Sequence, residues 1–119
     1  MQTGRGANQV PELYGSCCAV CDIADHGLLI TSHIVGWAAG PEHRGDLTNV
    51  ICLCRIHDAL FERGYWSLDD GLGLFKRALP QSRLIQLLLD RMESFRSPAV
   101  FRPSASFLRI HRQCAGFPV

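Results

Sequence analysis

Cys18-Ala19-Val20-Cys21 and Cys54-Arg55-Ile56-His57 are two short segments with the same arrangement of metal-binding side chains. Each segment holds two soft ligands with two residues between them, a spacing that folds into a tight turn and presents both side chains to one ion. Two such turns complete the four-coordinate shell that structural zinc prefers. The sequence therefore predicts a zinc site whose ligands are Cys18, Cys21, Cys54 and His57.

The remaining cysteines fit this site less well. We prefer Cys18 over Cys17 as the first ligand because Cys17 would leave three residues before Cys21. Cys52 and Cys114 have no partner at ligand spacing, so we expect them in the core. An alternative is that all the cysteines are packed core thiols, which behave as small hydrophobic side chains.

The cellular compartment bears on how the six cysteines are interpreted. Residues 1–15 are polar and contain glycine, without the apolar run of a secretory signal, so we expect a cytoplasmic protein. Thiols stay reduced there, which favours metal ligands over disulfides. Two alternatives stay open: a small disulfide-bonded domain, and a redox protein that uses Cys18 and Cys21. The longest apolar stretches, such as residues 84–89, are too short to span a membrane.

Length and composition indicate one domain. The chain has 119 residues and is 47% hydrophobic, enough for a modest core that a metal ion would help to stabilise. Residues 1–12 are predicted to be a flexible arm and residues 13–119 the single folded domain. The formal net charge of +1 does not by itself indicate a nucleic-acid partner.

Hydrophobic patterns and turn residues predict the order of elements along the chain. Between the two cysteine segments we expect a buried strand and a loop, and at the second segment a short helix that Gly64 ends. A β-hairpin and two helices should follow; the first of these helices is amphipathic, and we expect it to pack on the hairpin, with a dimer face as the alternative. The predicted ranges are 28–35 (strand), 36–46 (loop), 55–63 (helix), 65–68 and 72–79 (hairpin), 80–95 (helix) and 104–114 (helix).

His33 is the residue that we expect to carry chemistry. It interrupts an apolar strand, in which a polar imidazole is unusual. The usual alternative is a core histidine whose ring nitrogens are hydrogen-bonded within the protein. A neutral imidazole takes a proton from water near pH 7. Asn49 can orient the ring or a phosphate through its amide, and Asp58 can hold a hard divalent cation through oxygen.

Three segments around these residues resemble the HNH endonucleases, most closely their restriction-endonuclease-like branch: Ser32-His33-Ile34-Val35-Gly36-Trp37, Asn49-Val50-Ile51-Cys52-Leu53-Cys54 and His57-Asp58-Ala59-Leu60-Phe61-Glu62-Arg63-Gly64. A fourth segment, Phe107 to Arg112, is similar to the helix that closes many members. The resemblance covers residues 13–117. It implies an α+β fold with a ββα-metal, treble-clef-like core held by structural zinc, followed by a β-hairpin and C-terminal helices.

The resemblance also implies roles for individual residues. His33 would be the general base, Asn49 the middle motif residue and Asp58 the last one, a ligand of catalytic magnesium or manganese. Many relatives have an aspartate before the base as a second metal ligand; Ser32, a poorer ligand, stands there in this chain. Gly36 and Val50 replace a usual proline and glycine, and neither change removes a catalytic group.

The substrate implied is DNA, cut in restriction or phage defence. A homodimer or a separate target-recognition protein would be the partner, and we expect no membrane association. The alternative is a zinc-stabilised module that binds DNA or protein and has lost the reaction. The arginines nominated as DNA contacts are Arg44, Arg55, Arg63, Arg109 and Arg112, each of which could instead be an ordinary surface residue.

Overall fold

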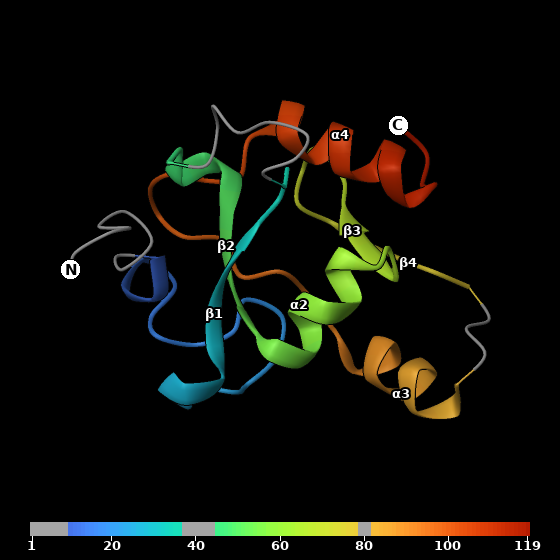
Figure 1. Cartoon of the computed structure of the whole chain (residues 1–119), viewed down its shortest axis with the longest axis horizontal. Helices are drawn as coiled ribbons and strands as arrows, with labels where there is room; N and C mark the ends of the chain where they lie inside the picture. Colours follow the sequence, from blue (N-terminus) through green and yellow to red (C-terminus); the bar gives the residue numbers. More distant parts are fainter. Residues whose placement is uncertain (1–9, 37–44, 79–81) are drawn as a thin grey trace.

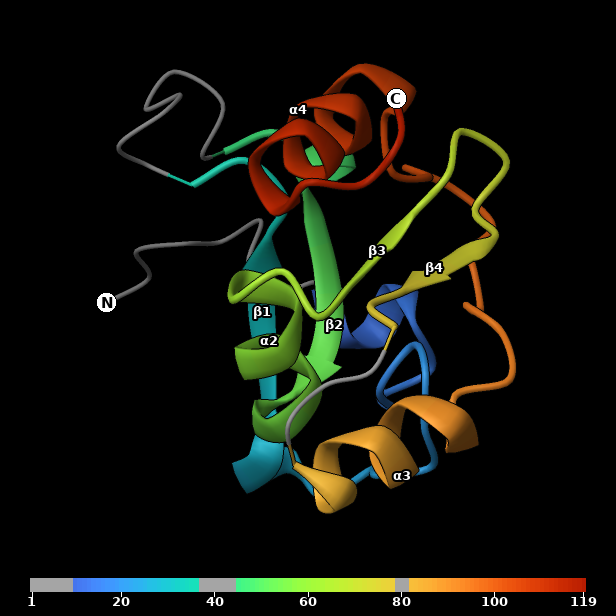
Figure 2. The ribbon, with the colours of Figure 1, turned by 90° about the vertical axis from the view of Figure 1, so that its right-hand side faces the viewer.

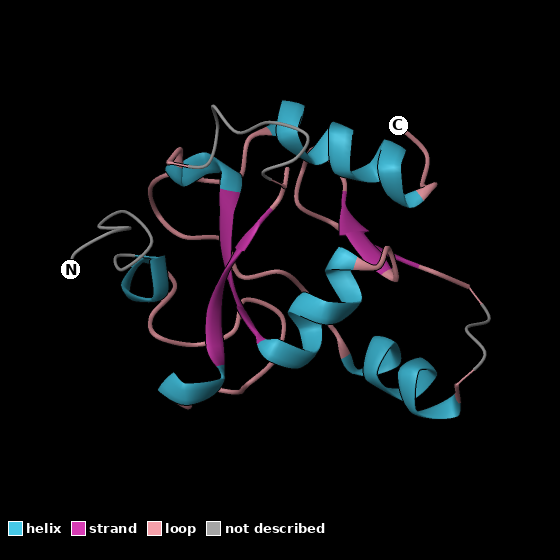
Figure 3. Ribbon diagram, viewed as in Figure 1, coloured by secondary structure: helices cyan, strands magenta, loops and turns pink. Residues whose placement is uncertain are grey.

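A computed structural model describes residues 10–36, 45–78 and 82–119 (Figure 1). Two antiparallel strand pairs form its centre, and helices surround them (Figure 3). The elements in chain order are η1 (His26–Leu28), β1 (Leu29–His33), η3 (Leu47–Asn49), β2 (Val50–Cys54), α2 (Arg55–Glu62), β3 (Trp66–Leu68), β4 (Leu74–Lys76), α3 (Arg83–Arg91) and α4 (Ala105–Ala115).

Strands β1 and β2 and helix α2 form one ββα unit. The strands pair antiparallel, with Leu29 opposite Cys54 and His33 opposite Val50. All five residues of β2 are buried, which explains their continuous apolar character. Helix α2 follows β2 without a loop and packs against both strands. This arrangement confirms the α+β fold predicted from the sequence.

Helix α2 ends at a glycine, as the sequence predicts. Gly64 has a φ of +79°, a left-handed conformation that a residue with a side chain rarely adopts. There is also little room for a side chain, because a Cβ atom at this position would lie 3.2 Å from the Cβ of Ala115 and 3.2 Å from Nη2 of Arg77. Gly64 therefore lets the end of α2, the end of α4 and the strand end at Arg77 approach one another.

The predicted hairpin is formed by β3 and β4. The turn between them depends on Asp69, whose Oδ1 accepts hydrogen bonds from the backbone nitrogens of Gly71 at 2.9 Å and Gly73 at 2.7 Å. Trp66 is fully buried and its Nε1 donates to the backbone oxygen of His57 at 3.0 Å. This bond ties the hairpin to α2.

Helix α4 packs against β3 of the hairpin (Figure 2). Its side of the contact uses residues one turn apart: Phe107, Leu108, His111 and Arg112. His111 and Ser67 share a hydrogen bond of 2.7 Å, and Nη1 of Arg112 donates to the backbone oxygen of Leu68 at 2.8 Å. The C-terminal helix is thus fixed to the hairpin by polar bonds inside an apolar contact.

Helix α3 is shorter than predicted. Ser82 caps its start by accepting from the Ile85 nitrogen, and the chain leaves helical conformation at Met92, so the predicted end at residue 95 is corrected to Arg91. Residues 80 and 81 of the predicted helix lie outside the described residues. Leu89 is fully buried and Met92 nearly so, which confirms that one face of this segment packs into the core. Across residues 10–36, 45–78 and 82–119, none of the helices has the length and apolar character needed to cross a membrane.

The structure also bears on the predicted N-terminal arm, on two cysteines and on the predicted loop. In the predicted arm, residues 10–13 are helical and Val10 is fully buried, so its described end belongs to the folded part. Cys114 is exposed, contrary to the expectation that it lies in the core, whereas Cys52 is fully buried as expected. Arg44 and most of the predicted loop at 36–46 lie outside the residues that the structure describes.

Candidate functional site

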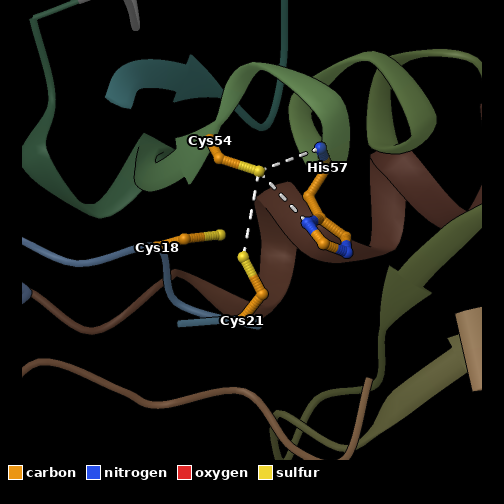
Figure 4. A group of neighbouring side chains, drawn as sticks. All are labelled: Cys18, Cys21, Cys54 and His57. Carbon is orange, nitrogen blue, oxygen red and sulfur yellow. Dashed lines mark hydrogen bonds between the residues drawn. The ribbon is translucent and has the colours of Figure 1, made fainter. Parts of the chain in front are cut away.

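The four predicted zinc ligands converge on one point (Figure 4). The sulfur atoms of Cys18, Cys21 and Cys54 and a ring nitrogen of His57 all lie within 4.8 Å of one another. The sulfur of Cys54 is 3.9 Å from that of Cys21 and 3.2 Å from Nδ1 of His57. A tetrahedron with metal–sulfur bonds of about 2.3 Å has edges of about 3.8 Å, so this donor set fits zinc.

Local structure explains why these four side chains meet. Cys54 ends β2 and His57 lies in the first turn of α2, where the Cys54 sulfur accepts a hydrogen bond from the His57 nitrogen at 3.4 Å. The segment with Cys18 and Cys21 is a tight turn, closed by a 2.9 Å bond from the Cys18 nitrogen to the Ile23 oxygen. That segment lies along β2, because the Ala19 nitrogen donates to the Cys52 oxygen at 2.9 Å.

Hydrogen bonds and burial shift the pKa values of the thiols in this cluster. A hydrogen bond from Cys54 lowers the pKa of Cys18 to about 3, although burial acts in the opposite direction. The same bond, together with burial, raises the pKa of Cys54. One thiolate is thus stabilised by a neighbouring thiol, and a bound metal would replace the shared proton.

A cavity of about 400 Å³ lies between β1, α2 and α4. Both His33, at the end of β1, and Asp58, in the first turn of α2, line it. The complete lining is Ile30, Thr31, Ser32, His33, Ile34, Val35, Gly36, Asp58, Phe61, Glu62, Ile110, His111 and Cys114. The structure therefore brings the predicted base and the predicted cation ligand to one cavity, although they are far apart in the sequence.

Asn49 lies beside this cavity and holds its wall. It is fully buried, its Oδ1 accepts from the Val35 nitrogen at 2.8 Å, and its Nδ2 donates to the Val35 oxygen at 3.1 Å. The Asn49 backbone oxygen also accepts from the Ile34 nitrogen at 2.8 Å. The amide thus fixes the chain directly after His33.

Two oxygen-bearing side chains accompany Asp58. Ser32 lines the cavity and is only 4% exposed. Glu62, which the sequence reasoning missed, lines it as well and follows Asp58 by one helical turn. Residues four apart lie on the same side of a helix, so the spacing of Asp58 and Glu62 could have predicted that both carboxylates face the same cavity. The oxygen atoms of Asp58, Glu62 and Ser32 are hard donors that suit a magnesium-like cation.

His111 forms a rigid wall of the cavity. Its ring stacks on Phe61, with centroids 3.7 Å apart and planes 4° from parallel. Nε2 donates to the Phe61 backbone oxygen at 2.9 Å, so Nδ1 accepts from the Ser67 hydroxyl at 2.7 Å. With both nitrogens engaged, His111 supports the end of α2 that carries Asp58 and Glu62.

The nominated arginines differ in their surroundings. Arg55 and Arg63 are exposed on α2 and at its end, and Arg109 is exposed but within 3.2 Å of Asp70. Arg112 is only 3% exposed, and its guanidinium donates to the Leu68 oxygen and to Asp70, both at 2.8 Å. The structure thus uses Arg112 to hold α4 on the hairpin, and we assign it to the fold rather than to DNA contact.

Comparison with known proteins agrees with this geometry. Residues 18–69 match the model of the HNH endonuclease family, which confirms the resemblance seen in the sequence. Among solved structures, the chain is similar to a modification-dependent TagI restriction endonuclease, with a TM-score of 0.69, 17% sequence identity and 97% of this chain covered. The match spans 38% of the TagI chain, and at this identity it concerns the fold. No curated protein matches the sequence.

Proposed function

We propose that the chain, whose residues 18–69 match the model of the HNH endonuclease family, is a metal-dependent DNA endonuclease that hydrolyses phosphodiester bonds. The observation that carries the proposal is the shared cavity of His33 and Asp58, since hydrolysis needs a base and a cation site next to one phosphate. The family match and the fold of the TagI endonuclease support the same reaction class.

In this proposal His33 is the general base. Its imidazole lies at the end of β1, half-buried beside a cavity large enough for a phosphodiester, and takes a proton from the attacking water. Asn49 keeps the following backbone in place, so that the ring stays aimed at the cavity. The phosphate is expected to stay on the downstream fragment, which then carries it at its 5′ end.

Asp58 is the proposed ligand for magnesium or manganese, with Glu62 and Ser32 as further oxygen donors. When bound there, the divalent cation supplies positive charge to the phosphate oxygens and to the departing oxygen. Ser32 stands where a carboxylate would bind more strongly, and Glu62 compensates for part of that loss because it adds a second carboxylate to the same cavity.

The Cys18, Cys21, Cys54 and His57 cluster is proposed to hold structural zinc. It joins the N-terminal turn to the junction of β2 and α2, and so fixes the two elements that carry His33 and Asp58 in one unit. Thiolate ligands require reduced cysteines, which favours a cytoplasmic location, and all six cysteines are free in the structure.

The proposed substrate is DNA, with Arg55, Arg63 and Arg109 as exposed candidates for backbone contacts. A role in restriction or phage defence is consistent with the TagI likeness, with a second copy or a recognition protein as partner. One second candidate function is a module on the same scaffold that binds DNA or protein without cutting it. Ser32 favours this alternative because it is a poorer metal ligand than a carboxylate.

Incubation with supercoiled plasmid tests the proposal. Purified protein should nick or linearise the plasmid with Mg²⁺ or Mn²⁺ and leave it intact when Ca²⁺ is the only added divalent ion. Glu62→Gln should weaken the response to Mg²⁺, since it removes one carboxylate from the cavity. Plasmid that binds the protein yet stays supercoiled with Mg²⁺ and Mn²⁺ would support the non-cutting module instead.

A further inference from the structure

The catalytic cavity continues into a smaller one. The second cavity has a volume of about 150 Å³ and shares Glu62, His111 and Cys114 with the first. The rest of its lining is Arg63, Gly64, Arg77 and Ala115. Its lining residues come mainly from the C-terminal ends of α2 and α4. These two helix ends approach each other (Figure 2). A polymer bound across His33 and Asp58 therefore has a second place to bind directly beside them.

The Arg77 guanidinium is fixed in this second cavity. Its Nε and Nη2 donate to the Gly64 backbone oxygen at 3.1 and 2.8 Å, and Nη2 also donates to the Ala115 oxygen at 3.1 Å. The rings of Tyr65 and Phe117 lie 5.7 and 5.9 Å from its central carbon. These bonds use the Nε and Nη2 donors. Nη1 has no hydrogen-bond partner among the described residues, so its two N–H groups can bind a ligand.

The charges in the cavity select an anion. Arg63 is exposed, and no hydrogen bond or ion pair of its side chain is found among the described residues. Glu62 contributes the one carboxylate among the described lining residues, and a cation in the catalytic cavity would neutralise it. Two guanidinium groups then face a site of phosphate size, and guanidinium forks match phosphate oxygens better than ammonium groups do.

We infer that Arg77, with Arg63 beside it, binds the backbone phosphate next to the one that is cut. This inference rests on the proposed function. The strand being cut passes from the cavity of His33 and Asp58 over the end of α2 to Arg77. Arg77 is a positioning residue: it contacts a phosphate that does not react and sets the register of the strand.

The test measures DNA binding to duplexes that each carry one neutral methylphosphonate linkage. With Ca²⁺ added to permit binding without cutting, wild-type protein should bind about tenfold more weakly when one linkage beside the cut is neutral, the loss of one charge-assisted contact. Arg77→Gln should bind the unmodified duplex about tenfold more weakly and should show no further loss with that neutral linkage.

Arg91→Gln is the matched control. It removes an exposed arginine that lines a different cavity, beside the metal cluster with Cys21 and His57, and so changes the net charge by the same amount. This variant should keep the full tenfold sensitivity to the neutral linkage. If Arg77 had only a structural role, Arg77→Gln would bind all duplexes more weakly by the same factor. The neutral linkage would then still weaken its binding about tenfold.

The inference is overturned if Arg77→Gln keeps the wild-type sensitivity at every linkage. Should this variant fail to fold, the same scan on Arg63→Gln decides, because the Arg63 side chain makes none of the backbone contacts that Arg77 makes. If DNA binding depends on the neutral linkage through Arg77 but the protein does not cut DNA in Mg²⁺, the proposed reaction is refuted and this inference stands. Cutting with sensitivity independent of Arg77 and Arg63 refutes this inference alone, and absence of DNA binding refutes both.

Discussion

Asn49 binds the backbone of Val35 with both ends of its amide, at 2.8 Å through Oδ1 and 3.1 Å through Nδ2. Val35 lies two residues after His33, so the buried side chain of Asn49, at the end of η3, determines where the chain after the imidazole goes. Because Asn49 is fully buried, its amide satisfies these backbone groups inside the protein, and losing it leaves them without that partner.

Asn49→Ala should therefore be costly. It leaves the Val35 nitrogen and oxygen without their partner inside the protein, and we expect a loss of about 2 to 4 kcal/mol in the free energy of unfolding. Urea unfolding followed by circular dichroism measures this change. A variant as stable as the wild type would contradict the buried geometry of the amide.

Metal removal should unfold the domain. In Cys54→Ser the cluster loses a thiolate that also caps α2, so metal content and the melting temperature should both fall sharply. The control is Cys114→Ser, which changes an exposed cysteine outside the cluster. Equal zinc content in the two variants, by elemental analysis, would rule out the metal site.

Gly64→Ala should destabilise the junction of α2, α4 and β4. The substitution forces a side chain into the left-handed region and brings its Cβ to 3.2 Å from Ala115 and Arg77, for a loss of about 1 to 2 kcal/mol or more. Thermal unfolding measures the loss. Gly27→Ala is the comparison, since nothing lies within 4 Å of a Cβ there; similar losses in both would contradict the close approach at Gly64.

His111 should make stability depend on pH. Burial lowers the pKa of its imidazole below the ordinary value of 6.5, and the charge of Arg112 acts in the same direction, although the bond to the Phe61 oxygen opposes both. The His111 imidazole therefore binds a proton more readily in the unfolded chain than in the folded protein. The contribution is fully present above about pH 6.5 and is lost as the pH falls from there toward the folded value.

The measurement compares wild type with His111→Gln, whose amide cannot titrate. The unfolding free energy of the wild type should fall more steeply between pH 6.5 and 5 than that of the variant. The comparison is needed because acid also weakens metal binding by cysteine and histidine in both proteins. Parallel pH profiles would show that His111 is not a neutral, buried group.

Local sequence was sufficient where spacing along the chain determines the structure. The two-residue gaps of the cysteine segments, the glycine at 64 and the turn residues at 69–71 each act within a few residues, and the helix predicted at 55–63 lies close to the observed α2. The pairing of His33 with Asp58 in one cavity followed from the family resemblance rather than from spacing alone.

Tertiary contacts determined what the sequence could not show. Arg112 looks like any helix arginine, but the Leu68 oxygen and Asp70 draw it inside. Cys114 follows His111 by three residues on α4, yet it faces a cavity instead of packed protein. The proposed phosphate-binding role of Arg77 depends on the ends of α2 and α4 lying beside it. The sequence around residue 77 contains no pattern that predicts this contact.

The rate of DNA cleavage by His33→Ala tests the central claim most directly. We predict a rate at least about 100-fold below that of the wild type in Mg²⁺, with unchanged zinc content and melting temperature, because the base is lost while the fold remains. His26→Ala, which changes an exposed histidine in η1, should keep the full rate. A His33→Ala protein that cuts at the wild-type rate would contradict the account.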